Sequence, residues 1–174
     1  PWKEGWRSFK KSKSALFGTS IVLFFILLAI VGPFIAPYGI NDQNLPNRLA
    51  PPSSEHWFGT DDLGRDIFSR ILHGTRISLT VGFTAVILSA IIGSFLGIIA
   101  GYYGRWIDTI ISRVFDIMLA FPSILLAIAI VSILGPSLQN ALIAIAIINV
   151  PNFGRLIRSR VLTVKEEEYI HAAR

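Results

Sequence analysis

The fold of this chain is decided by residues 77–104, ISLTVGFTAVILSAIIGSFLGIIAGYYG, a stretch without one charged side chain. About 20 apolar residues cross the hydrocarbon layer of a bilayer as a helix. Small residues recur at every fourth position of this stretch: Ala85, Ser89, Gly93, Gly97 and Gly101. Residues four apart share one helix face, and small side chains there let a second helix approach closely. The stretch therefore predicts a spanning helix at about residues 77–100 that packs tightly against a neighbour.

The composition of the whole chain is also apolar. Of its 174 residues 52% are hydrophobic and only 16% are charged, and the mean hydropathy is +0.59. A soluble domain usually has about 25% charged residues. Residues 117–154 carry no charge and are too long for one span, so Gly135-Pro136-Ser137 divides them into spans at about 114–134 and 138–155. Phe121-Pro122 predicts a kink within the former.

The first apolar run, Leu16 to Ala36, follows basic residues, as the core of a secretory signal peptide does. It is longer than the roughly 7–15 residues of such a core, and no small-residue cleavage site follows it. We therefore expect an uncleaved span at about residues 16–36. The basic tail before it, residues 1–13, fits either a short helix in the headgroup region or a disordered segment.

Residues 37–76 form a long polar loop that contains four prolines and five acidic residues. We expect a short amphipathic helix at about residues 61–73, lying on the membrane surface and leading into the next span. Thr60 or Asp61 would cap its start, and Gly74 would suit its C-terminal end. Asp66 and Arg70 have the spacing of a helical ion pair.

The basic residues predict the orientation. The segments before the first span, between the second and third, and after the fourth hold 12 of the 16 Lys and Arg residues. The positive-inside rule places these segments in the cytoplasm, and hence the N-terminus there and the 37–76 loop outside. The net charge of +5 is explained by this orientation, so we expect membrane lipid and not nucleic acid as a partner.

Residues for catalysis or metal binding are not evident. The chain has no cysteine, and His56, His73 and His171 lack metal-ligand spacing. The segment from Gly59 resembles a P-loop only superficially, because Arg65 and Asp66 replace its Lys and its Ser or Thr. We therefore expect no enzymatic activity, catalytic residue, cofactor or metal in this chain.

Several strings of residues together resemble the permease subunits of bacterial ABC importers of the dipeptide, oligopeptide and nickel type. They are ALFG at 15–18, FIAPY at 34–38, HWFGTDDLGRD at 56–66, Asp116, AFP at 120–122 and EYIHAAR at 168–174. The external string continues, so the family motif there comprises Gly59, Thr60, Asp61, Gly64, Arg65, Asp66, Ser69, Arg70, Gly74 and Arg76. The last string resembles the start of the cytoplasmic EAA loop, although His171 stands where that motif usually has Glu.

The resemblance implies an all-α, polytopic transmembrane bundle, of which four of six expected spans are seen. It implies an N-terminal region at 1–76 and a permease domain at 77–174 that is incomplete at its C-terminus. The implied partners are a second permease, usually a different homologue, two ATP-binding subunits that use ATP and Mg, and an external solute-binding protein. Coupling to the ATPase is implied for Glu167, Glu168, Tyr169, Ile170, His171, Ala172, Ala173 and Arg174.

One alternative is an ion-coupled secondary transporter or channel without ATP. It depends on Asp116, Asn149 and Asn152, polar residues next to or inside a charge-free stretch. A proton relay needs more than one buried ionisable group, and Arg113 lies one helical turn from Asp116. An Arg113–Asp116 ion pair near the interface is therefore the favoured interpretation of this carboxylate.

Overall fold

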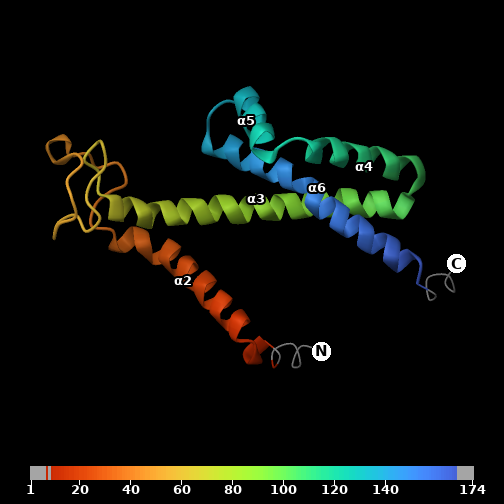
Figure 1. Cartoon of the computed structure of the whole chain (residues 1–174), viewed down its shortest axis with the longest axis horizontal. Coiled ribbons are helices and arrows are strands. Elements are labelled where there is room, and N and C mark those ends of the chain that lie inside the picture. Colours follow the sequence, from red (N-terminus) through yellow and green to blue (C-terminus); the bar gives the residue numbers. More distant parts are fainter. Residues whose placement is uncertain (1–6, 8, 168–174) are drawn as a thin grey trace. The chain divides into compact units, whose positions relative to one another are not determined.

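The computed structural model describes residue 7 and residues 9–167, and this part of the chain is helical without any β-strand. Residues 1–80 and residues 81–174 form two compact units, and the boundary between them lies within one helix. Figure 1 shows the helices in chain order. The predicted all-α class is confirmed, whereas the choice between helix and disorder for residues 1–13 concerns mainly residues outside the described part.

The first unit contains α2 (Lys13–Ile35) and the start of α3 (Ile67–Tyr103). Ser12 caps α2, because its side chain accepts a hydrogen bond of 3.3 Å from the N–H of Ala15. The helix ends before Pro37, whose ring forces Ala36 into an extended conformation. Near the loop, a Cβ on Gly32 would lie 3.3 Å from Leu72 Cβ, so α2 and α3 are in close contact there.

A loop of residues 36–66, which we call the 36–66 loop, joins these helices and includes the 3-10 turn Leu45–Asn47. The separate helix expected at 61–73 is not formed. Residues 61–65 make a turn in which Gly64 has a φ of +72°, and α3 begins only at Ile67. Gly74 does not end a helix but lies inside α3, which continues to Tyr103.

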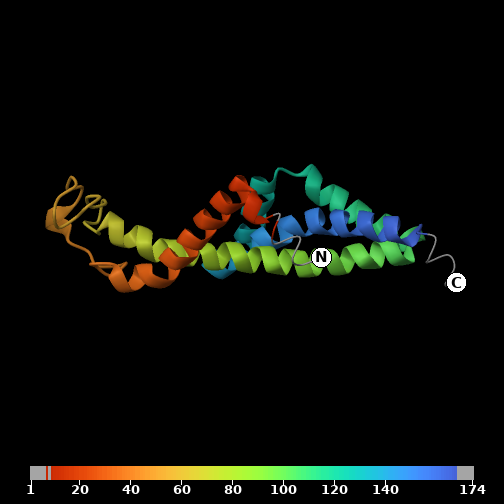
Figure 2. The ribbon, with the colours of Figure 1, turned by 90° about the horizontal axis from the view of Figure 1, so that it is seen from below.

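The second unit contains the rest of α3 together with α4 (Arg105–Ala120), α5 (Ser123–Leu134) and α6 (Leu138–Lys165). Gly104, with a φ of +63°, lies between α3 and α4. Most of residues 101–113, the segment between the expected second and third spans, is thus helical. Within α4, the Ser112 hydroxyl donates to the Asp108 carboxylate one turn away at 3.2 Å. Figures 1 and 2 show α6 crossing the C-terminal half of α3.

Phe121 and Pro122 break the apolar segment more strongly than the expected kink, since α4 and α5 meet at 98°. At the other end of α5, Ser137 caps α6 by accepting a hydrogen bond of 3.1 Å from the N–H of Asn140. The Asn140 amide in turn donates to the carbonyls of Leu134 and Gly135 at 2.8 and 3.0 Å. This exchange of hydrogen bonds fixes the α5–α6 turn.

Three of the described helices, α2, α3 and α6, are long and apolar enough to cross a membrane. The bent pair α4–α5 makes a fourth candidate if it acts as one span. Many large apolar side chains on these helices are exposed, among them Phe34 at 82% and Ile133 at 85%. Such a surface suits hydrocarbon and not water.

Candidate functional site

Asp61 organises the 36–66 loop. Its carboxylate accepts hydrogen bonds from the N–H groups of Leu63 and Arg65 at 2.9 and 3.0 Å, and from Arg65 Nε at 2.8 Å. Arg70 forms a further ion pair with it. Burial opposes ionisation of Asp61, but the N–H groups of Arg65 and Leu63 and the Arg65 guanidinium outweigh this effect and lower its pKa to about 2. The predicted Asp66–Arg70 pair is therefore wrong, because the turn brings Asp61 to Arg70.

Asp66 caps α3. Its carboxylate accepts a hydrogen bond of 2.7 Å from the N–H of Ser69, and its carbonyl accepts one from the N–H of Arg70. The other carboxylate oxygen accepts from His56 Nδ1 at 3.0 Å. Burial opposes ionisation here too, yet the hydrogen bonds from Ser69 and His56 prevail and lower the pKa of Asp66. The cap is therefore Asp66, not the expected Thr60 or Asp61.

The remaining motif residues hold the backbone of the loop together. The Thr60 hydroxyl donates to the Asn47 carbonyl and accepts from the N–H of Ala50 at 2.8 Å. Ser69 Oγ accepts from the N–H of Tyr38 at 3.1 Å. Side chains at Gly59 and Gly64 would meet the carbonyls of Ala50 and Asn44. Gly74 and Arg76 lie in α3 outside this network.

We predict that Asp61→Asn loosens the 36–66 loop. The substitution removes the charge that holds Arg65 and Arg70 and one of the acceptors used by the backbone. We expect limited proteolysis within residues 48–66 to become much faster. Asp62→Asn is the control, because the Asp62 side chain is 79% exposed and its nearest cation, Arg65, is 3.9 Å away. Equal cleavage rates for the two variants would contradict the role of Asp61.

The lowered pKa of Asp61 predicts how the loop responds to acid. A carboxylate with a folded-state pKa of about 2, below its ordinary 3.8, stabilises the loop above the ordinary value. This contribution is lost as the pH falls through the folded-state value. Protease resistance of the loop, measured with an acid-active protease, should thus persist near pH ~4 and disappear toward pH ~2. In Asp61→Asn this pH-dependent loss should be smaller, because Asp66, whose pKa is also lowered, remains.

The small residues of α3 lie against α6. A Cβ on Gly93 would lie 2.5 Å from the Val150 carbonyl oxygen, and one on Gly97 would lie 2.5 Å from that of Gly154. At one end of the row, Ser89 Oγ donates to the Ala146 carbonyl at 3.0 Å, next to the buried Ala85. At the other end, a Cβ on Gly101 would lie 2.8 Å from Val161 Cβ.

Gly154 is the position on α6 where three helices meet. Phe115 of α4 is 1% exposed, and its ring occupies the space that a side chain on Gly154 would need. The same added Cβ would also lie 3.4 Å from the Gly93 carbonyl oxygen of α3. Because the side chain of glycine is only a hydrogen atom, α6 can contact both α3 and α4 at this position.

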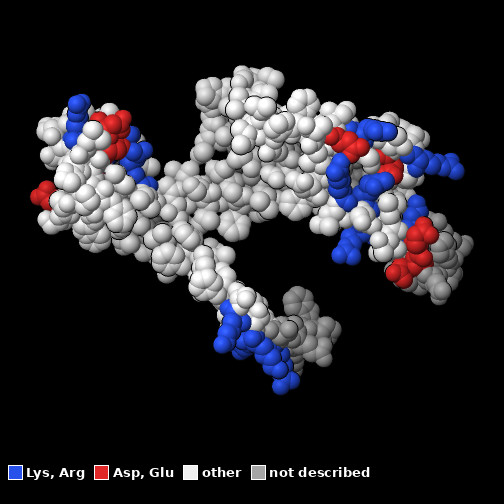
Figure 3. All heavy atoms as spheres, viewed as in Figure 1, with Lys and Arg blue, Asp and Glu red and all other residues white. Residues whose placement is uncertain are grey.

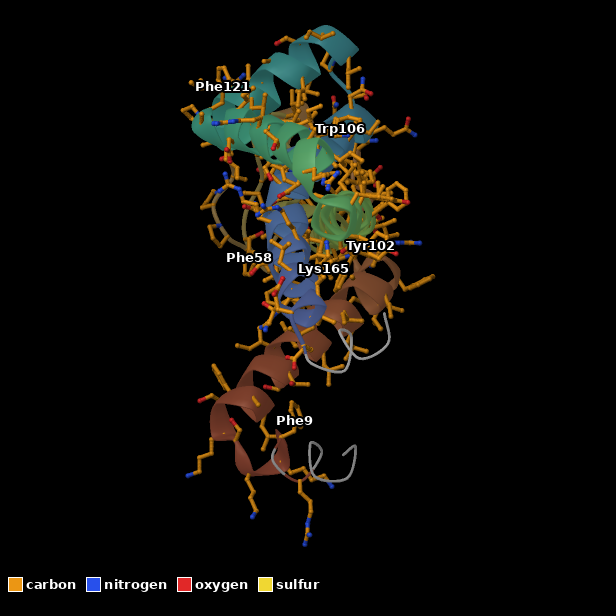
Figure 4. All side chains as sticks on the ribbon, turned by 90° about the vertical axis from the view of Figure 1, so that its right-hand side faces the viewer. Phe9, Phe58, Tyr102, Trp106, Phe121 and Lys165 are labelled. Carbon is orange, nitrogen blue, oxygen red and sulfur yellow. The ribbon has the colours of Figure 1, made fainter. Side chains whose placement is uncertain are left out.

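Ion pairs join α4 to α6. Arg158 contacts both carboxylate oxygens of Asp108, and its Nη2 lies 2.6 Å from Oδ2. Arg155 pairs with Asp116, so the expected Arg113–Asp116 pair is wrong. Lys165 Nζ donates to the Tyr102 carbonyl at 3.0 Å at the end of α3, as Figure 4 allows the reader to follow. Figure 3 shows the charged side chains of the second unit gathered over α4 and the C-terminal part of α6.

Sequence reasoning missed Asp108–Arg158 and Lys165–Tyr102 because 50 and 63 residues separate the partners. The only sequence signal for these contacts was that charged residues flank the apolar stretches. Of the predicted coupling residues the structure describes Glu167, which is exposed and directly follows the cap of α6. Glu168–Arg174 lie outside the described part.

Two family models match the chain. Residues 1–52 match the N-terminal TM domain of oligopeptide transport permease C, and residues 93–174 match the binding-protein-dependent transport system inner membrane component. The dipeptide transport system permease protein DppC of Alkalihalophilus pseudofirmus is 63% identical over 174 residues, which is all of this chain and 57% of that protein. The chain belongs to the ABC importer permeases of the dipeptide and oligopeptide type.

Other relatives of this permease chain have related names. The DppC protein of Haemophilus influenzae is 45% identical over all of the chain and 61% of its own length. The glutathione transport system permease protein GsiD of Pectobacterium atrosepticum is 46% identical over all of the chain and 58% of its own length. The permease chain thus spans somewhat more than half the length of these relatives.

Proposed function

We propose that this permease forms part of the translocation path of an ATP-driven importer, which takes up peptides or related small solutes. The observation that carries the proposal is the 63% identity to a dipeptide transport permease along the whole chain. The helices α2, α3 and α6, which are apolar enough to span a membrane, support it. An external solute-binding protein would deliver the substrate, and a second permease would complete the path.

Two separate ATP-binding subunits would hydrolyse ATP, with Mg bound there and no cofactor in this chain. The permease would lie in the bacterial inner membrane with its N-terminus in the cytoplasm. The distribution of Lys and Arg over the sequence supports this orientation. The 36–66 loop would then face the binding protein, and the charged ends of α4 and α6 would face the ATPase.

Residues 167–174 would form the contact with the ATPase. In the structure α6 ends at Lys165, and Asp108, Asp116 and the Tyr102 carbonyl hold its charged end. A helix tied in this way moves as a rigid element, so a displacement of the loop by the ATPase would be transmitted to the spans.

We predict that Ala173→Arg abolishes ATPase association, because a long charged side chain cannot fit a contact built for a small one. Ala173→Ser at the same position is the control and should retain the complex. Co-purification of the full-length permease with tagged ATP-binding subunits measures the outcome. If the Arg variant retained the complex like the Ser variant, the coupling role of this segment would be refuted.

Transport by the complete complex tests the function itself. Proteoliposomes containing both permeases, the ATPases and the binding protein should accumulate dipeptide only with ATP, and an ionophore should not change the rate. The ion-coupled alternative predicts the reverse dependence. The structure gives the ion-coupled alternative little support, because its acidic candidate, Asp116, forms an ion pair with Arg155.

A further inference from the structure

The break between α4 and α5 exposes backbone inside an otherwise apolar segment. Phe121 is extended, with φ −84° and ψ 139°, and Pro122, the N-cap residue of α5, provides no side-chain hydrogen bond to the helix. Hydrocarbon does not solvate backbone polar groups, so breaks at membrane depth occur where protein or a polar cavity adjoins them. The residues that surround this break therefore indicate how its backbone polar groups are satisfied.

A cavity of about 350 Å³ lies at the break. Met118, Phe121 and Ser123 line it from the α4–α5 side, and Asn149 and Asn152 line it from α6. Figure 4 marks Phe121 at this corner of the second unit. The volume lies within the roughly 300–1,000 Å³ of small-molecule sites.

The two asparagines make this cavity polar. They are three residues apart on α6, within the stretch 117–154 that carries no charge. Asn149 Nδ2 donates to the Ile145 carbonyl at 2.8 Å, which leaves its amide oxygen available. The Asn152 side chain makes no hydrogen bond to any residue in the described part of the chain. Amides left without partners in apolar surroundings are costly, so water or a polar ligand is needed here.

The chemistry of the cavity fits a peptide backbone. A carboxamide offers both a donor and an acceptor, as a peptide bond does. Met118 and Phe121 supply an apolar wall, and methionine adapts to side chains of different shape. The half-exposed Asp116–Arg155 pair lies within one turn of the cavity along both helices and offers opposite charges to a zwitterion.

We infer that this cavity, between the α4–α5 break and Asn149 and Asn152 of α6, binds the backbone of the peptide as it passes. The inference rests on the proposed function and assigns a substrate contact within that path. It concerns amide recognition and not side-chain selection, so it applies to peptides of varied sequence.

The test is peptide uptake by the complete reconstituted complex. Asn149→Leu and Asn152→Leu should each raise the KM for dipeptide about three- to tenfold, the value of one net hydrogen bond, and the double variant more. Gln139→Leu is the control, because Gln139 is an exposed amide near the start of α6. It should leave the KM unchanged. The ATPase rate of Gln139→Leu without substrate should also be unaffected.

A raised KM in the leucine variants could also come from a folding defect, and a labelling experiment distinguishes the two causes. Residues 1–174 contain no cysteine, so Asn152→Cys introduces the one thiol among them. In a complex with cysteine-free partner subunits, a water-soluble thiol reagent should label it, and dipeptide during ATP turnover should slow the labelling at least threefold. An unreactive thiol together with unchanged KM values would show that protein fills the cavity and would overturn the inference. ATP-dependent uptake by the unaltered complex would still stand as the separate test of function.

Discussion

Gly97→Ala should destabilise the helix bundle by about 1–3 kcal/mol, the usual cost of overpacking, although it adds a single methyl group. That methyl carbon would lie 2.5 Å from the Gly154 carbonyl oxygen and 3.1 Å from the Arg158 nitrogen. Both atoms belong to the backbone of α6 and cannot rotate away. The helices must separate, and the hydrogen bond from Ser89 to α6 weakens with them.

Gly82→Ala is a matched control in the same helix. Nothing lies within 4 Å of a Cβ at Gly82, so this change should be neutral or stabilise by up to about 1 kcal/mol through helix propensity. Thermal unfolding of the purified complex in one detergent compares the two variants. The expected result is a Tm shift of opposite sign or of clearly different size. Equal shifts would mean that α3 and α6 do not pack as described.

The small-residue row illustrates what the sequence could predict. A period of four identifies the face of α3 that carries Ala85, Ser89, Gly93, Gly97 and Gly101. The identity of the facing helix does not follow, because any apolar helix could lie there. Gly154 is equally unpredictable: a single glycine in α6 has no periodic signal, and its need arises only from Phe115 and Gly93 on two other helices.

In the 36–66 loop, by contrast, the local spacing of charged residues predicts the wrong ion pair. Asp66 and Arg70 are correctly spaced for a helical pair, yet Asp66 is engaged by Ser69 and His56. The φ of +72° at Gly64 turns the chain so that Asp61 meets Arg65 and Arg70 instead. The motif strings identified the important residues, but only the folded turn determines which of them are partners.

Removing the Asp108–Arg158 ion pair should have the second large effect. The side chains of Asp108 and Arg158 are only 19% and 32% exposed, and Ser112 also donates to the carboxylate. Asp108→Ala leaves the guanidinium partly buried without its partner, which should cost about 1–3 kcal/mol. A double-mutant cycle with Arg158→Ala isolates the pair, and a coupling free energy above about 1 kcal/mol is expected because the contact is bidentate.

The Asp116–Arg155 pair provides the matched comparison on the same two helices. Its side chains are 48% and 51% exposed, so solvent screening should hold its coupling energy below about 1 kcal/mol. The free energy of unfolding should be measured for both double-mutant cycles. A larger coupling energy for Asp108–Arg158 would show that burial, and not only the short distance between the charges, gives the pair its stability. Because α6 continues into the proposed coupling loop, Asp108→Ala should also lower the peptide transported per ATP hydrolysed. Equal coupling energies in the two cycles would contradict the difference in burial on which this prediction depends.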